Sequence, residues 1–297
     1  MSPSQWLLLA FLSVLWGGSF LFVGVAVREL PPFTLVLARV ATAALLLAPV
    51  LAIMGLRLPR GRAGWQPFLV MGLLNNVVPF TLIVSGQREI ASGLASVLNA
   101  TTPLFALIVA RAVSRNEPLA ANTLTGIALG IAGVGVLMGP EAVFGGGSSL
   151  LGMLLCLGGS LSYGLASAWG RRLRSTPPLV SATSQLICST VMLAPIALLV
   201  DAPWVLPMPR PVTLLAVLGL AVLSTALAYV VFYRILAVSG PDNAMLVTLL
   251  IPLSGIWLGV TFLDETILPR HLLGAGIIAL SLIVIDGRLF RRRGTAQ

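Results

Sequence analysis

The sequence predicts an all-α integral membrane protein with ten transmembrane helices, arranged as two inverted five-helix repeats. Three observations support this prediction: the composition, the number of long apolar segments, and a pattern of residues that occurs twice. Of the 297 residues, 58% are hydrophobic and only 9% are charged. Soluble domains carry about 25% charged residues, so this composition excludes a water-soluble core.

Ten segments of the chain are apolar enough to cross a bilayer, which takes about 20 residues per helix. The first has no basic residue before it and no clear small-residue cleavage site. We therefore interpret it as a retained helix rather than a signal peptide. The segments are 5–27, 33–54, 65–84, 91–113, 122–138, 150–170, 179–200, 211–233, 242–263 and 269–287.

An internal repeat divides the chain into two halves. In each half a proline inside an apolar segment is followed by a glutamate and then by a glycine-spaced segment. The spacing from proline to glutamate is 14 residues in the first copy and 13 in the second, and the spacing from glutamate to glycine is 9 in both. The landmarks are Pro103, Glu117 and Gly126 in the first half (residues 1–145) and Pro252, Glu265 and Gly274 in the second half (residues 146–297).

Each half contains five segments, an odd number, so the two halves must enter the membrane in opposite orientations. The double proline at 31–32 matches the one at 177–178 with an offset of 146 residues, and the same offset aligns Arg39 with Gln185. Inverted repeats of this kind are typical of secondary transporters, which bind their substrate near the membrane midplane between the repeats.

The distribution of arginine predicts the orientation in the membrane. All 18 basic residues are arginines; 12 of them lie in the breaks on one side or in the C-terminal tail, and 4 lie in the alternate breaks. Positively charged loops remain in the cytoplasm. We therefore expect a multi-pass protein of the bacterial inner membrane with both termini in the cytoplasm.

The residue inventory argues against several other functions. A phosphate-binding Walker loop needs a lysine, and the chain has none. Zinc sites and Ser-His-Asp triads have little to build on, because His271 is the single histidine and Cys156 and Cys188 lie in apolar segments. No basic stripe alternates with aromatic residues, so a nucleic-acid partner is not expected. We predict no enzymatic activity, no cofactor and no metal; the expected partners are a small-molecule substrate and the lipid bilayer.

The chain resembles the EamA family of the drug/metabolite transporter superfamily. The resemblance rests on Trp16-Gly17-Gly18-Ser19 in the first segment, Arg39 in the second, and the two segments that run from proline to glutamate. Within the superfamily the chain is most similar to bacterial exporters of aromatic and other amino acids and related metabolites. The resemblance implies a central cavity lined mainly by helices 1, 3, 4, 6, 8 and 9, with helices 2, 5, 7 and 10 outside it.

The candidate substrate-binding residues are polar and aromatic side chains on the helices expected to line that cavity. Their spacing supports the choice, because residues four apart share one face of a helix. The alternative for each is a structural role, either as an aromatic anchor at the membrane interface or as a polar bridge between helices. The candidates are Trp16, Asn76, Phe80, Asn99, Tyr163, Thr225, Tyr229 and Tyr233.

Arg39 has two interpretations. It could bind a substrate carboxylate, or it could have a structural role, with its side chain extending to the membrane interface or capping carbonyls of a neighbouring helix. The resemblance places its helix outside the cavity, which favours the second. All nine carboxylates fall in breaks or at segment ends, and a neutral or zwitterionic substrate therefore fits best. If transport is coupled to protons, Glu117 and Asp242 are the first groups to test.

Prolines and glycines complete the set of predicted features. Pro103 and Pro252 are hinge candidates, because a proline interrupts helix hydrogen bonding. Small residues at a spacing of four allow close helix packing, either within one chain or between two copies. We expect packing within the chain, and a monomer rather than a dimer. The glycines concerned are Gly126, Gly130, Gly133, Gly274 and Gly276.

The sequence thus predicts a secondary transporter that exports small neutral or zwitterionic metabolites, amino acids first among them, by alternating access. One alternative is a transporter of the same superfamily for drugs, nucleosides or sugar derivatives. The other is a membrane-embedded enzyme or a receptor-like binding protein.

Overall fold

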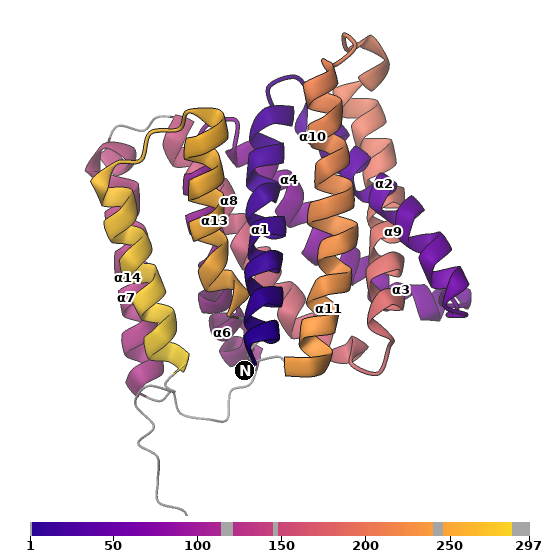
Figure 1. The fold of residues 1–297 in the computed structure, drawn as a ribbon, viewed down its shortest axis with the longest axis horizontal. Helices are drawn as coiled ribbons and strands as arrows, with labels where there is room; N and C mark the ends of the chain where they lie inside the picture. The colour runs from indigo at the N-terminus through magenta and orange to yellow at the C-terminus, as the bar shows by residue number, and fades with distance from the viewer. Residues whose placement is uncertain (1, 114–120, 145–147, 240–245, 287–297) are drawn as a thin grey trace, which may run out of the picture.

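The computed structural model describes residues 2–113, 121–144, 148–239 and 246–286, and every regular element within these ranges is a helix (Figure 1). Glu117 and Asp242 lie outside the described residues. The elements of the first half are α1 (Pro3–Ala26), α2 (Pro32–Ile53), α3 (Gly61–Gly72), η1 (Leu73–Val77), α4 (Val78–Gly86), α5 (Ser92–Asn99), α6 (Thr102–Val113) and α7 (Ala121–Phe144).

The second half contains the same kinds of element in a similar order. They are α8 (Ser148–Gly170), η2 (Arg171–Leu173), α9 (Pro178–Ile196), η3 (Ala197–Asp201), η4 (Pro203–Val205), α10 (Pro211–Ala221), η5 (Val222–Leu227), α11 (Ala228–Ser239), α13 (Val247–Leu263) and α14 (Pro269–Asp286).

The helices begin where sequence chemistry favours a helix start. Ser2 caps α1 with a capping box that includes Gln5, and prolines occupy the first turns of α2, α9 and α10, where their missing N–H has no helical partner to lose. The α7 ribbon bends at Gly139, whose φ of 72° lies in the left-handed region that glycine adopts without steric cost.

Seven helical stretches in the described ranges are long and apolar enough to cross a membrane. Three shorter apolar helices, Thr123–Gly139, Val247–Leu263 and Pro269–Ile285, lie at the remaining predicted segments. Large apolar side chains cover the outside of the bundle; Leu45, for example, is 74% exposed and Leu215 is 66% exposed. A surface of this kind needs lipid rather than water around it, and the chain is therefore a multi-pass integral membrane protein.

Helix contacts within the bundle come in matched sets. α2 packs against α9, and α7 packs against α14; the α7–α14 pair forms one edge of the bundle (Figure 1). α1 packs against α13, while α8 packs against α5 and α6. The contact of α4 with α8 matches the contacts of α10 and α11 with α1. The contact of α3 with α9 matches the contact of α10 with α2. Each of these contacts thus has a counterpart when the first and second halves are exchanged.

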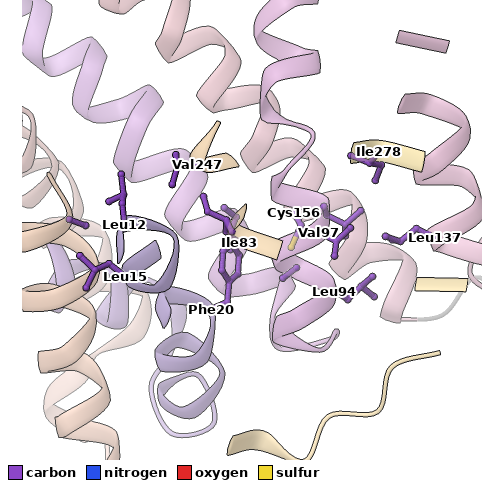
Figure 2. Packing of buried hydrophobic residues seen from close by; sticks show 14 of the residues in the cluster. Leu12, Leu15, Phe20, Ile83, Leu94, Val97, Leu137, Cys156, Val247 and Ile278 are labelled. Carbon is purple, nitrogen blue, oxygen red and sulfur yellow. The ribbon is translucent and has the colours of Figure 1, made fainter. Parts of the chain in front are cut away.

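The buried core follows the same helices. One cluster of buried side chains joins α1, α4, α5, α7, α8, α11, α13 and α14, with Leu12, Phe20, Ile83, Val97 and Val247 among its members (Figure 2). Because lipid is as apolar as these side chains, close packing rather than removal from water holds membrane helices together. Small residues allow that packing: a Cβ atom at Gly274 would lie 2.8 Å from the carbonyl oxygen of Gly133.

The glycine prediction is largely confirmed by these contacts. The positions of Gly126, Gly130, Gly133 and Gly274 face the side chains or backbone of other helices of the same chain within 4 Å. Gly276 differs, because a Cβ atom there would meet nothing within 4 Å. Whether the protein is a monomer stays a prediction.

Candidate functional site

A cavity of about 340 Å³ lies between the two halves. Its volume falls within the range of small-molecule sites. Helices of both halves line it with aromatic rings, amides and hydroxyls; no described aspartate or glutamate lines it. The lining residues are Trp16, Ser19, Phe20, Val23, Arg39, Met71, Asn75, Phe80, Ile83, Val84, Gln87, Asn99, Thr102, Tyr163, Ser167, Gln185, Ser224, Thr225, Tyr229, Phe232, Tyr233, Val247, Thr248 and Ile251.

Seven of the eight predicted substrate-binding residues line this cavity. They come from α1, α4, α5, α8, η5 and α11. Their presence on the cavity wall places them where a ligand could reach them, and contact with substrate stays a prediction. The seven are Trp16, Phe80, Asn99, Tyr163, Thr225, Tyr229 and Tyr233.

Asn76 is the exception, and its neighbour Asn75 takes its place. Asn76 is fully buried; its Nδ2 donates to Ser189 Oγ at 3.0 Å, and its Oδ1 accepts from the Tyr229 hydroxyl at 3.2 Å. The cause is η1, a π-helical turn at Leu73–Val77. In a π-helix the hydrogen bonds run from i to i+5. The residue that shares a face with Phe80 is therefore Asn75, five positions earlier, and not Asn76. A sequence pattern of four-residue spacing cannot detect that shift.

The second half has a π-helical turn at the matching place, η5 at Val222–Leu227. Its wider turn leaves the backbone carbonyl of Leu220 to accept a hydrogen bond from Thr225 Oγ1 at 2.8 Å. The predicted stripe of Thr225, Tyr229 and Tyr233 continues from η5 into α11, and all three side chains line the cavity. The rings of Tyr229 and Tyr233 stack with centroids 6.1 Å apart. π-Helical turns are frequent at functional sites.

The expectation that α2 and α9 lie outside the cavity is wrong in one respect. Each helix contributes one long polar side chain to the wall, Arg39 from α2 and Gln185 from α9. Arg39 is 6% exposed and does not extend to the interface, because its Nε donates to Thr225 Oγ1 at 2.9 Å and its guanidinium carbon lies 3.6 Å from the Phe80 ring centroid. Gln185 Oε1 accepts from Asn75 Nδ2 at 3.0 Å.

These two residues could have been found from the sequence. Ionisable side chains within membrane helices usually belong to a functional site, and the offset of 146 residues pairs Arg39 with another polar residue, Gln185. The chain therefore brings the same position of both halves to the same cavity. The family resemblance, which places the second and seventh helices outside the cavity, predicts the opposite.

The helix break near Asn99 also lies on the cavity wall. α5 ends at Asn99 and α6 begins at Thr102. The backbone carbonyl of Asn99, one turn before Pro103, accepts from Thr102 Oγ1 at 2.7 Å, so a side chain replaces the helical hydrogen bond that proline cannot make. Pro252 differs, because it is buried inside α13, which continues past it. The hinge role of both prolines stays a prediction.

Five carboxylates with described side chains lie away from the cavity, at the end of the bundle opposite the N-terminus (Figure 1). Glu265, after α13, accepts from the backbone N–H groups of Ser92 at 2.6 Å and Gly93 at 2.9 Å. Asp201 accepts from the backbone and hydroxyl of Thr34 at 2.6 and 2.9 Å. Each of these contacts joins one half of the chain to the other. The remaining three are Glu29, which pairs with Arg210, Glu89 and Asp264.

Comparisons with known proteins show the family of the chain and a shared fold. A model of the EamA-like transporter family matches residues 4–139 and 150–286. The chain is 26% identical to the "uncharacterized inner membrane transporter YedA" of Escherichia coli strain K12, over 92% of this chain and 88% of that protein. It is 25% identical to the "uncharacterized transporter YvbV" of Bacillus subtilis strain 168, over 98% and 94%. A crystal structure with 18% identity and a TM-score of 0.67 shares the fold over 98% of this chain and 99% of that one.

Proposed function

Because the chain belongs to the EamA-like transporter family, we propose that it is a secondary transporter that moves small amino-acid-type metabolites outward across the bacterial inner membrane by alternating access. One observation carries the proposal: helices of both halves, whose contacts correspond to one another, together line the cavity that contains Arg39 and Gln185. In transporters built from inverted repeats, such a cavity is the fixed site around which the halves rock.

The proposed architecture is ten membrane-spanning helices in two inverted repeats, residues 1–145 and 146–297. Two further observations support it. The π-helical turns η1 and η5 occur at matching places of the third and eighth helices, and the family model matches one stretch in each half. The proposed orientation, with both termini in the cytoplasm, rests on the arginine distribution. The inner membrane is proposed because the relative YedA is named as an inner membrane transporter.

The contacts of Glu265 and Asp201 have a natural place in this mechanism. Both hold the N-terminus of a helix in the first half from the end of a helix in the second half. Negative groups stabilise helix N-termini. Opening the bundle at this end would break both contacts, so these carboxylates hold that end closed until the halves move.

Amino-acid-type cargo is supported by the lining of the cavity, which offers aromatic rings for a side chain and amides and hydroxyls for polar groups. The test is uptake into proteoliposomes that contain the purified protein. Labelled neutral, aromatic, acidic and basic amino acids would be compared, with and without a pH gradient, against protein-free liposomes. Saturable uptake of neutral or aromatic amino acids is the expected result. The absence of uptake for every amino acid would refute the cargo.

A further inference from the structure

Arg39 is a buried positive charge with neutral partners. Among its described contacts are one hydrogen bond, from Nε to Thr225 Oγ1, and one ring contact, with Phe80. A guanidinium has five N–H donors, so one described hydrogen bond leaves most of its donor capacity for something else. The side chain lines the cavity between the halves, and a bound molecule could therefore reach these donors.

No described carboxylate neutralises this charge. The described lining of the cavity contains no aspartate or glutamate. Glu29, Asp201 and Glu265 are engaged with Arg210, Thr34 and the start of α5, at the end of the bundle opposite the N-terminus. A charge buried without a partner is costly, and an anionic group on the ligand would supply the missing partner.

The lining of the cavity offers less to a ligand's ammonium group than to its carboxylate. An ammonium group gains most from a carboxylate; the described lining has none and offers only neutral groups, namely amide and hydroxyl oxygens and the faces of aromatic rings. The cavity therefore discriminates between the two charges of an amino acid. Its one described charge selects for the carboxylate and nothing of opposite sign selects for the amine.

The rest of the lining suits an aromatic body. The rings of Trp16 and Phe232 have centroids 5.3 Å apart, and those of Phe232 and Tyr233 are 5.5 Å apart. These three side chains form a continuous aromatic wall on α1 and α11. Stacking against such a wall favours a planar apolar group on the ligand.

A second hollow supports an anionic ligand. It has a volume of about 470 Å³ and is lined by Arg28 and Arg88 together with Glu265. Gln87 lines both this hollow and the central cavity. Its Nε2 donates to the Phe20 carbonyl at 2.9 Å, and this held side chain is shared by the walls of both spaces. The two arginines outweigh the one carboxylate of this hollow, and a lining with net positive charge raises the local concentration of anions.

We propose that Arg39 binds the carboxylate of the transported molecule, and that the ligand class is small aromatic carboxylates, for which the amino group is dispensable. This inference rests on the proposed transport function and specifies its substrate. Aromatic amino acids fall within the class, and so do aromatic acids that lack the amine. Aromatic amines that lack the carboxylate fall outside it.

The test is equilibrium binding by calorimetry to the purified protein in nanodiscs at pH 7. Three probes share one ring: L-phenylalanine, 3-phenylpropionate without the amine, and phenethylamine without the carboxylate. Phenylalanine and phenylpropionate are expected to bind and phenethylamine is not. Arg39→Gln should weaken the binding of both carboxylates about 10- to 100-fold, the range for losing a hydrogen bond to a charged group. Arg39→Lys should give an intermediate loss, since lysine keeps the charge but not the planar fork.

Arg234→Gln is the matched control, because Arg234 is an exposed arginine of α11 that does not line the described cavity; it should leave binding unchanged. If Arg39→Gln fails to fold, the three probes on the native protein still decide the question. Binding of phenethylamine as tight as that of phenylpropionate, or no binding of any probe, would overturn the inference.

Flux separates this inference from the transport function. Binding that depends on the carboxylate without flux in proteoliposomes leaves the assignment of Arg39 standing and refutes transport. Saturable flux of aromatic amines at the same rate as carboxylates refutes the assignment and leaves transport standing.

Discussion

Replacing Glu265 with glutamine should loosen the junction between the two halves. The native carboxylate accepts backbone hydrogen bonds of 2.6 and 2.9 Å from the first turn of α5. Hydrogen bonds to a charged group contribute about 1.5–3 kcal/mol each and neutral ones about 0.5–1.5 kcal/mol. Glutamine keeps one acceptor and turns an NH₂ group toward the other N–H. Because Glu265 is half-buried, solvent reduces the difference, and we expect Glu265→Gln to lower the unfolding free energy by about 1–3 kcal/mol.

The assay is reversible unfolding in mixed micelles, followed by loss of helical circular dichroism. Asp264→Asn is the control: it makes the same chemical change one residue away, at a left-handed position (φ 54°) that asparagine tolerates. The control should stay within about 0.5 kcal/mol of the native protein. Equal unfolding free energies for Glu265→Gln and Asp264→Asn would refute the role of the carboxylate.

The same variant should change how often this end of the bundle opens. Ser92 is 2% exposed, so a cysteine placed there reacts with a membrane-impermeant maleimide only when the end opens. The native cysteines, Cys156 and Cys188, are buried and would first be replaced by alanine. A loss of 1–3 kcal/mol corresponds to a population shift of about 5- to 150-fold, and Glu265→Gln should raise the labelling rate of Ser92→Cys within that range. An unchanged rate would mean that opening does not break this contact.

Three further predictions concern hinges, packing and pH. Pro103→Ala or Pro252→Ala should slow transport more than it weakens substrate binding; equal loss of turnover and affinity would count against a hinge. Gly133→Val should destabilise the α7–α14 pair by about 1–3 kcal/mol of unfolding free energy, because its side chain would meet α14 backbone and side-chain atoms at 2.9–3.1 Å; Gly135→Val, which faces open space, is the control. Hydrogen bonds from the backbone and side chain of Arg210 hold the pKa of Glu29 below its ordinary value of 4.5. Because the pKa of Glu29 is lower in the folded than in the unfolded protein, its contact with Arg210 contributes to the unfolding free energy above the unfolded pKa. This contribution is lost as the pH falls through the folded pKa. The stability gap between native protein and Glu29→Gln should therefore close in acid, and a gap that widens there would contradict the assignment.

Hydrophobicity and repetition made the helical segments predictable. A membrane helix must satisfy its own backbone hydrogen bonds, and the requirement for a long apolar segment leaves a clear mark in the sequence. Seven stretches, α1 among them, meet the criteria for spanning. The stripe Thr225–Tyr229–Tyr233 was also predictable, because it follows ordinary helical spacing as it leaves η5.

The site was predictable where helices are regular and not where they depart from regularity. The four-residue spacing favours Asn76 over Asn75, because the π-helical turn η1 cannot be recognised from that spacing. The charge of Arg39 within a membrane helix and its match to Gln185 indicate a place in the site, but its partners Thr225 and Phe80 come from other helices and are not indicated. Contacts between residues far apart in the sequence decide where a long side chain such as Arg39 lies. A single sequence does not specify those contacts.

The central claim, alternating access between two halves, is tested most directly by counterflow. Proteoliposomes containing the native protein would be loaded with unlabelled phenylalanine, and entry of labelled phenylalanine would be measured at trace concentration. A carrier that exposes its site to one side at a time exchanges bound substrate as the halves rock. We predict transient accumulation of label above equilibrium that depends on the internal load. Entry of label at the same rate into loaded and empty vesicles would contradict alternating access.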